Sequence, residues 1–321
     1  MFDLQFFNSL QSRRILVVGD VMLDKFYLAK MAKFSSDAPI PVAKINDRYA
    51  SPGGAANVAR CLANLGAKPI LAGFVGNDHN YETFMKYSSR YDINHSGLLI
   101  TDHLTHTKVR VISQNQQVFR LDFDDDKPYD DALFDKLYNF IHQNLNKTLD
   151  AIVIADYEKG VCTEQFCQNV IRDANSHGTP TLVLPYGINW IKYAHADFIV
   201  PNTNKINRVL LSPVDPKDDR QNLAAAHYIR RKFSIKTALL TRSAYGITLA
   251  NDLCEQHFPT KQQLLVDPAG AADAVIAATT AAVANGKSPI VAANLSNLVA
   301  GIAVSQPGSY APTYQEIIDA A

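Results

Sequence analysis

The sequence predicts an α/β fold with a parallel sheet and a small additional β-sheet, and two observations lead to it. First, six short apolar runs each end in a turn and are followed by segments of helical length and periodicity. Strands that alternate with helices are typical of a layered α/β fold. Second, two segments with a different pattern interrupt this alternation, at about residues 25–48 and 105–123.

The six apolar runs are the expected strands of the main sheet. They lack strict alternation, as expected for strands that are buried on both faces of a parallel sheet. The runs are 15–18, 69–74, 151–154, 181–184, 198–200 and 237–240. The stretches between them, such as 57–65 and 133–145, have the length and period of helices.

The two interrupting segments predict a small β-sheet that projects from the α/β body. Residues 105–123 alternate polar and apolar types, which indicates two antiparallel strands with a turn near Gln114 and Asn115. Residues 25–48 contain aromatic and β-branched residues together with two prolines. We therefore expect one domain over residues 1–321, with a β-lid formed by these two insertions.

Composition excludes several classes of function. The 31 basic and 31 acidic side chains give no net charge, so nothing indicates a nucleic-acid partner. No apolar stretch approaches the roughly 18 residues of a membrane span, so no membrane partner is expected. The four cysteines are scattered, which predicts free thiols and a cytoplasmic location.

Several common functional motifs are absent or incomplete. Gly286-Lys287-Ser288 looks like the end of a P-loop, but Ala281 occupies the position of the first required glycine. The triplet also ends an alanine-rich segment, where glycine and lysine are typical of a helix C-terminus. No G-x-G-x-x-G or H-E-x-x-H motif occurs, so neither a classical dinucleotide site nor a zinc hydrolase is indicated.

Residues 52–59, PGGAANVA, form the first informative motif. Gly53 and Gly54 precede small residues and Asn57 at the start of an apolar helix. Small side chains let a ligand approach the backbone, and a helix N-terminus offers free N–H groups. The Asn57 amide can hydrogen-bond hydroxyl groups. The alternative is an ordinary glycine turn before a capped helix.

Residues 267–273, DPAGAAD, form the second motif. A tight turn of small residues at a helix start makes an anion-binding nest, and Asp273 stands beside it. Phosphoryl transfer needs both parts: N–H groups and a helix dipole for the phosphate, and a carboxylate for the attacking hydroxyl. The alternative for Asp273 is a simple helix cap.

In combination, these motifs resemble the ribokinase, or phosphofructokinase-B, family of sugar kinases. Gly19-Asp20 with Asp24, then residues 52–59, then residues 267–273 follow that family's motif order. The stretches DVMLDKFY at 20–27, TKVRVISQNQQVFRLDF at 107–123 and ADYEKG at 155–160 resemble the bacterial heptose 7-phosphate kinases. These enzymes often form the kinase half of a bifunctional heptose kinase/adenylyltransferase. The resemblance covers nearly the whole chain.

The resemblance implies a ribokinase-like three-layer α/β/α sandwich whose β-sheet lid often forms a homodimer interface. It also implies ATP- and Mg²⁺-dependent phosphorylation of the anomeric hydroxyl of a heptose 7-phosphate, a lipopolysaccharide precursor. We find no H-x-G-H motif and expect no adenylyltransferase domain in residues 1–321.

The resemblance also implies roles for particular residues. Asp273 is the expected catalytic base, and the expected anion hole is formed by Gly270, Ala271 and Ala272. The expected sugar-binding residues are Asp24, Gly53, Gly54, Asn57 and Asp156. The expected nucleotide-binding residues are Asn202, Lys205, Thr241, Ser243 and Gly246.

The phosphate already on the sugar calls for cations on the lid strands. Our candidates are Lys108, Arg110 and Arg120, because guanidinium and ammonium groups pair well with a phosphate dianion. The alternative is that these three are ordinary solvated charges on a β-surface.

The sequence departs from the family pattern on the nucleotide side. Ala272 replaces a glycine, which is tolerated in a right-handed helix but costs about 1 kcal/mol or more if φ must be positive. The family's N-x-x-E, which organises magnesium, ends here in Lys205, which cannot accept hydrogen bonds from magnesium's water shell. Tyr186 and Ala244 replace the lysine of D-P-K and the glutamate of T-R-S-E. Metal ligands therefore remain unassigned.

Two functions stay open at this point. The first is an active sugar-phosphate kinase. The second is a kinase fold that binds a sugar phosphate or a protein partner without turnover.

Overall fold

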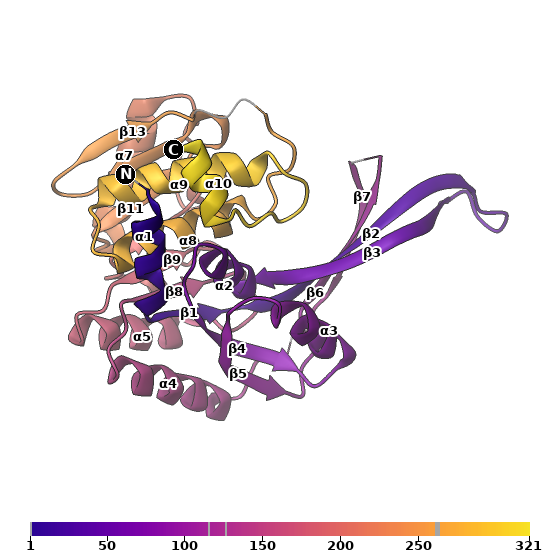
Figure 1. Ribbon diagram of the computed structural model, residues 1–321, viewed down its shortest axis with the longest axis horizontal. Coiled ribbons are helices and arrows are strands. Elements are labelled where there is room, and N and C mark those ends of the chain that lie inside the picture. Colours follow the sequence, from indigo (N-terminus) through magenta and orange to yellow (C-terminus); the bar gives the residue numbers. More distant parts are fainter. Residues whose placement is uncertain (1, 115, 126, 261–263) are drawn as a thin grey trace.

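The computed structural model describes residues 2–114, 116–125, 127–260 and 264–321, and its main body is a nine-stranded sheet covered by helices on both faces (Figure 1). The strand order is β13-β12-β11-β10-β9-β8-β1-β4-β5. Neighbouring strands are parallel from β5 to β11, while β12 and β13 are antiparallel. The strands are β1 (Ile15–Gly19), β4 (Ile70–Gly76), β5 (Asn94–Thr101), β8 (Ala151–Ala155), β9 (Thr181–Leu184), β10 (Phe198–Ile199), β11 (Thr237–Thr241), β12 (Ile247–Ala250) and β13 (Glu255–Phe258).

Two hydrophobic cores lie on opposite faces of this sheet. Along β1, Ile15 and Val17 belong to one core, while Leu16 and Val18 belong to the other, which explains why the strand is apolar without alternation. The first core is covered by α1 (Leu4–Ser9), α2 (Ala55–Asn64), α3 (His79–Ser88), α8 (Ala271–Ala284), α9 (Pro289–Val304) and α10 (Tyr314–Ala320). The second is covered by α4 (Asp131–Leu145), α5 (Glu164–Ser176), α6 (Thr203–Asn207) and α7 (Asp219–Phe233). The expected three-layer sandwich is confirmed.

A separate four-stranded sheet forms the lid and extends away from the body (Figure 1). Its order is β3-β2-β6-β7, formed by β2 (Val21–Phe34), β3 (Pro41–Gly54), β6 (Thr107–Ser113) and β7 (Gln116–Phe123). The predicted β-sheet lid is confirmed, and the antiparallel pair of β6 and β7 lies where the alternation placed it. Asn115, expected in the turn between them, lies outside the described residues.

The lid strands are longer than the sequence pattern indicated. β2 begins immediately after Asp20 and β3 ends at Gly54, so both of these lid strands are continuous with sequence motifs, Gly19-Asp20 and residues 52–59. Met22 and Leu23 are buried, so the first residues of β2 pack against the body. As a result, the sugar-side motifs occupy the base of the lid.

The helices also bear on the Gly286-Lys287-Ser288 triplet and on the search for a membrane span. α8 has its C-cap at Asn285, and Gly286 follows with φ of 67°, so the Gly-Lys-Ser triplet ends a helix as expected. Among the described residues, no helix has both the length and the apolar character needed to cross a bilayer.

Candidate active site

Two helix N-termini meet at the base of the lid. Gly54 ends β3 and is the N-cap of α2, with φ of 58°. A Cβ on Gly54 would collide with the backbone oxygen of Asp20, so glycine is required there. A Cβ on Gly53 would lie 2.8 Å from Asp24 Oδ2, so the absence of a side chain keeps this carboxylate in place.

Asp273 lies in the first turn of α8 and is 7% exposed. Its Oδ2 accepts a hydrogen bond from Asn57 Nδ2 at 2.6 Å, and its Oδ1 accepts one from the Tyr157 hydroxyl. Burial raises the pKa of Asp273, although these two hydrogen bonds and the Lys205 ammonium oppose the rise. The result is a fixed carboxylate with increased proton affinity, as a general base requires.

The turn before Asp273 has the conformation of an anion-binding helix start. Gly270 is the N-cap with φ of 76°, and Ala271 begins the helix. Ala272 lies inside the right-handed helix, and neither it nor Ala269 has positive φ. The alanine that replaces the family's second glycine therefore causes no backbone strain. N–H groups in the first turn of a helix lack intrahelical acceptors and bind anions.

Asn57 has one amide atom free for a ligand. Its Nδ2 is used by Asp273, while its buried Oδ1 has no partner among the described residues. Buried polar atoms are almost always paired, so an unpaired oxygen at this position suits a substrate hydroxyl.

The lid presents a charged row beside these residues. Asp24 accepts a hydrogen bond from Arg110 Nη1 at 2.5 Å and pairs in register with Lys108 on the neighbouring strand. Lys108 is half-buried; burial lowers its pKa, against the attraction of Asp24. Arg120 lies opposite Arg110 one strand further out, exposed and paired with Asp122 at 2.8 Å. The structure thus brings Lys108 and Arg110 to Asp24 and leaves Arg120 more distant.

Asp156 does not reach the open side of the site. It is 0% exposed and accepts hydrogen bonds from the Tyr193 hydroxyl at 2.5 Å and the Glu158 N–H at 2.7 Å. It also forms an ion pair with Lys192. These contacts give Asp156 a structural role. Its expected contact with the sugar stays a prediction.

On the expected nucleotide side, two departures from the family pattern contact each other. Asn202 caps α6 and accepts the Lys205 N–H at 2.8 Å. The Lys205 ammonium lies 5.2 Å from the centroid of the Tyr186 ring, within cation–π range. Burial lowers the pKa of Lys205 to about 8, while the charges of Asp273 and Asp156 attract its proton.

The remaining expected nucleotide residues lie near the end of β11. Thr241 forms a bridge with Asn202, which places both segments side by side. Ser243 is exposed, with φ of 52°, in the 3₁₀ helix Ser243–Tyr245. Gly246 has φ of 85°, and a Cβ there would collide with the Phe258 oxygen. Asn202 and Thr241 thus lie side by side, while the nucleotide contacts of these residues stay predictions.

Among the residues that the structure describes, we find no side-chain cluster that fits magnesium. Of the described residues, one group has the spacing of metal ligands: Asp20, Asp156 and Cys162. All three are buried, and both carboxylates are already occupied by internal donors. Lys205 stands where a magnesium-organising glutamate was expected. We therefore derive no step through the metal.

Sequence reasoning missed two residues that shape the site. Tyr157 contacts the base, and Asp20 fixes the loop that carries Tyr157. Asp20 accepts backbone N–H groups of Tyr157, Lys159 and Val161 at 2.7, 3.2 and 3.1 Å. Burial and the charge of Asp156 raise the pKa of Asp20 to about 6. The motifs at 19–20 and 155–160 were visible in the sequence, but their contact was not.

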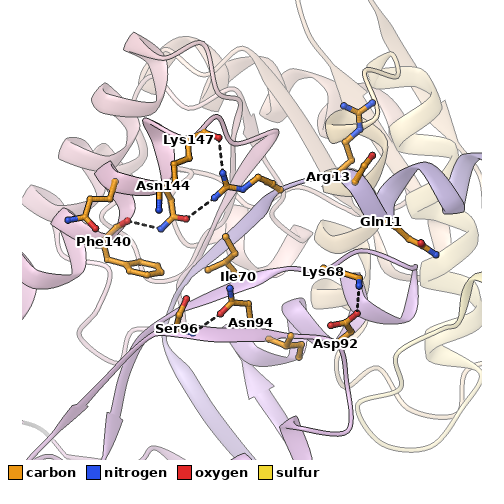
Figure 2. Close-up of a pocket in the computed structure, with 14 residues that line it drawn as sticks. Gln11, Arg13, Lys68, Ile70, Asp92, Asn94, Ser96, Phe140, Asn144 and Lys147 are labelled. Carbon is orange, nitrogen blue, oxygen red and sulfur yellow. Dashed lines mark hydrogen bonds and ion pairs between the residues drawn. The ribbon is translucent and has the colours of Figure 1, made fainter.

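A cavity of about 540 Å³ lies elsewhere, around the amino ends of β1, β4 and β5 (Figure 2). Figure 2 shows its polar groups bonded to one another, including Lys68 with Asp92 at 3.1 Å and the Ser96 N–H with Asn94 at 2.9 Å. Ligands of open α/β sheets bind outside the carboxyl ends of the strands, where Asp20 and Asp156 follow β1 and β8. The candidate site is therefore the one built around Asp273.

Comparison with known proteins shows the family of the chain. The model of the pfkB family of carbohydrate kinases matches residues 12–316. The chain is 34% identical over 311 residues to the bifunctional protein HldE of Shewanella denitrificans, covering 97% of this chain and 64% of that protein. It is 35% identical over 302 residues to HldE of Methylobacillus flagellatus, covering 92% of this chain and 60% of that protein. The chain thus spans less than two thirds of the length of these curated relatives.

Solved structures show the same fold at low sequence identity. Phosphofructokinase-2 from Escherichia coli in complex with potassium matches with a TM-score of 0.79 and 15% identity, over 96% of this chain and 97% of that one. Ribokinase from Arabidopsis thaliana complexed with ribose and ATP matches with a TM-score of 0.74 and 15% identity, over 96% and 98% of the two chains. The ribokinase-like α/β fold is confirmed.

Proposed function

Because the chain belongs to the pfkB family of carbohydrate kinases, we propose that it transfers the terminal phosphoryl group of ATP to the anomeric hydroxyl of a heptose 7-phosphate. The observation that carries this proposal is the buried Asp273 carboxylate, fixed by Asn57 and Tyr157 at the N-terminus of α8. A base and a phosphate-binding helix start thus lie together, as phosphoryl transfer to a hydroxyl requires.

In the proposed reaction, Asp273 takes the proton of the sugar hydroxyl as its oxygen attacks the phosphorus. The bond between the phosphorus and the ADP oxygen breaks, and the first turn of α8 stabilises the charge on the transferring group. The free Asn57 Oδ1 accepts a second sugar hydroxyl. Magnesium, when it accompanies ATP, neutralises phosphate charge.

The lid supports a sugar that already carries a phosphate. Lys108 and Arg110 lie on one face of β6, next to Asp24 at the lid base. A phosphate dianion there would meet two cations and share Arg110 with Asp24. This pairing of an anomeric hydroxyl at Asp273 with a distal phosphate on the lid fits a long sugar phosphate.

A second candidate function, sugar-phosphate binding without turnover, is favoured by one observation. Lys205 occupies the position where the family pattern has a glutamate, and the described part of the chain offers no side-chain cluster that fits magnesium. Binding on the sugar side would survive this change, because Asp24, Gly53 and Asn57 keep their contacts.

We also propose that two copies of the chain associate through the lid. β7 is an edge strand, and all eight of its residues are exposed, including Phe119 at 59%, Leu121 at 42% and Phe123 at 47%. An exposed apolar edge strand is a template for pairing with another strand. An antiparallel pair of identical strands is self-complementary about a two-fold axis, so a second copy is the natural occupant.

Localisation follows from the thiols. All four cysteines are free, three of them buried, as a reducing compartment such as the cytoplasm maintains. We propose a cytoplasmic enzyme.

The test measures ADP release from Mg-ATP with heptose 7-phosphate, for the wild type and for Asp273→Asn. We expect turnover in the wild type and a loss of about 10²- to 10⁴-fold in the variant, because the carboxamide cannot take the proton. Asp252→Asn, on an exposed aspartate paired with Arg230, is the matched control and should keep wild-type turnover.

Binding measurements separate the alternatives. No turnover, together with a thermal shift by the sugar phosphate and none by Mg-ATP, would support binding without catalysis. Turnover with another sugar phosphate and none with the heptose would keep the kinase and overturn its substrate. Failure of heptose 7-phosphate to bind at all would rule it out as the ligand, both for the kinase and for the protein that binds without turnover.

A further inference from the structure

The side chain of Tyr157 touches the proposed base and has no role in the reaction described so far. Tyr157 follows β8, in the loop that begins at Asp156, and its hydroxyl donates a hydrogen bond to Asp273 Oδ1. Burial, reinforced by the charge of Asp273, raises the pKa of Tyr157 well above its ordinary value. The phenol therefore keeps its proton at neutral pH and acts as a hydrogen-bond donor.

The hydroxyl is held in place through the backbone of its own loop. The Tyr157 N–H donates to Asp20 Oδ2 at 2.7 Å, and Asp20 accepts two more N–H groups of the same loop. Lys159, two residues further on, forms an ion pair with Asp124, which lies just beyond the end of β7. Anchors on β1 and at the root of the lid thus fix the position from which Tyr157 reaches the base.

The two oxygens of Asp273 have different donors on them. Tyr157 occupies Oδ1, and Asn57 occupies Oδ2 at 2.6 Å. With both oxygens held, the carboxylate cannot rotate, and its remaining lone pairs keep a fixed direction. Rigid positioning of a base to within a few tenths of an ångström is worth orders of magnitude in rate.

We propose that Tyr157 is the positioning residue of the base: its hydroxyl, together with the Asn57 amide, fixes the plane of the Asp273 carboxylate. This inference rests on the proposed function, in which Asp273 takes the proton of the sugar hydroxyl. Tyr157 keeps its own proton throughout, so the proton balance of the transfer is unchanged.

A tyrosine that only filled space would leave the proton affinity of Asp273 alone. A hydrogen bond donated to a carboxylate stabilises the charged form and lowers the pKa, whereas burial raises it. In this site burial outweighs the donors, so the pKa of Asp273 is already above its ordinary value. Removing the Tyr157 hydroxyl should therefore raise it further.

The experiment compares the wild type with Tyr157→Phe by two readouts. Isotope-edited carbon NMR follows the titration of the Asp273 carboxyl, whose signal is assigned by its loss in Asp273→Asn. We expect its pKa to rise by about one unit, the effect of one charge-assisted hydrogen bond. The acidic limb of kcat/KM should move up in pH by the same amount, and kcat should fall.

Tyr193→Phe is the matched control, because it removes a hydroxyl that donates to a different buried carboxylate, Asp156, at 2.5 Å. The Asp273 titration should stay at its wild-type position in this variant. An unchanged Asp273 pKa in Tyr157→Phe would overturn the proposal, as would an equal shift in Tyr193→Phe.

A second measurement covers the case in which Tyr157→Phe does not fold. Site-specific incorporation of difluorotyrosine at position 157 keeps the ring and strengthens the donor, so the pKa of Asp273 should fall. No fall would overturn the proposal. A wild type without turnover would refute the proposed function, while the NMR titration would still decide the Tyr157 contact.

Discussion

Asn57 donates its side-chain amide to Asp273 across 216 positions of sequence, with 2.6 Å between Nδ2 and Oδ2. This contact joins the N-termini of α2 and α8, so the sugar-side motif and the phosphate-side motif form one site. The same hydrogen bond fixes the orientation of the Asn57 amide, so that Oδ1 is available to the proposed substrate. A direct side-chain contact thus holds the two motifs together.

Activity should show a bell-shaped dependence on pH. The acidic limb reflects Asp273, whose pKa is raised by burial, since the base must be deprotonated. We expect the basic limb to reflect Lys205, whose pKa is lowered by burial to about 8, because the proposed nucleotide site would use its ammonium to bind anionic phosphates. Measuring kcat/KM from acid to alkaline pH checks both limbs.

Lys205→Met tests the assignment of the basic limb. The decline above about pH 8 should disappear, and the acidic limb should rise because the lysine charge lowers the pKa of Asp273. Lys236→Met, on an exposed lysine paired with Asp197, is the control and should reproduce the wild-type profile. A basic limb that persists in Lys205→Met would contradict the assignment.

Discrimination for a phosphorylated sugar should depend on the inner lid cations. Arg110→Gln should raise KM for heptose 7-phosphate by roughly 10- to 100-fold, the loss of one charge-assisted contact, and affect unphosphorylated heptose less. Arg120→Gln is matched in chemistry and register, but its guanidinium is exposed and paired with Asp122. Steady-state kinetics with both sugars should show a smaller effect for Arg120; equal effects would place the phosphate elsewhere.

Asp20 should make stability fall as pH rises. Its pKa is raised from 3.8 in the unfolded chain to about 6 in the folded one, so between these values the folded state binds the proton more tightly. The stabilisation is present below about pH 4 and is lost as pH rises through about 6, on the order of 3 kcal/mol in all.

The measurement for Asp20 is urea unfolding of the wild type and Asp20→Asn across this pH range. The wild type should lose stability relative to the variant as pH rises. Asp92→Asn, on an exposed aspartate paired with Lys68, keeps Asp20 and should retain the wild-type slope. Parallel curves for the wild type and Asp20→Asn would show that Asp20 is not the titrating group.

Self-association through the lid should depend on the exposed edge strand. Phe119→Asp combined with Leu121→Asp places two like charges on a pairing edge, so a wild-type dimer should become a monomer in sedimentation velocity. Leu253→Asp is the control and should leave the dimer intact. This leucine is 97% exposed and lies between β12 and β13, outside the lid. A monomeric wild type would end this proposal.

The chemistry of the site could be predicted where local physics determines it. Glycines at the end of a strand, small residues before a helix and an aspartate in its first turn are short-range patterns. They led to Gly53, Gly54, Gly270 and Asp273, and the structure brings these residues together at one site. Ala272, doubtful by its sequence, is harmless because it lies inside the helix.

Long-range contacts could not be predicted. The Tyr157 hydroxyl and Asp273 are 116 positions apart, and the Tyr157 N–H and Asp20 are 137 apart. No periodicity relates such pairs. For Asp156 the family resemblance implied a sugar contact, which stays a prediction; its contacts with Tyr193 and Lys192 could not be predicted from the sequence either.

The fold was predicted except at the margins of the sheet. The sequence pattern missed β5, β12 and β13. β5 and β13 are the two edge strands and carry fewer continuous apolar residues, as the largely exposed Glu255–Phe258 illustrates. β12 lies inside the sheet and is buried, but it has only four residues. The central strands, enclosed by two cores, have the continuous apolar composition that makes a parallel sheet recognisable.

The alternation along β6 has a consequence for changes in chain length. Lys108 and Arg110 point to one face of the lid, while Val109 and Val111 point to the other and are buried. Inserting or deleting one residue ahead of this strand would turn the cations away from Asp24 and expose the valines in the same event. The register of β6 therefore sets both the face that carries the proposed substrate-binding cations and the face that packs into the lid. Deleting one residue here would disrupt both faces, whereas a single substitution would alter only one of them.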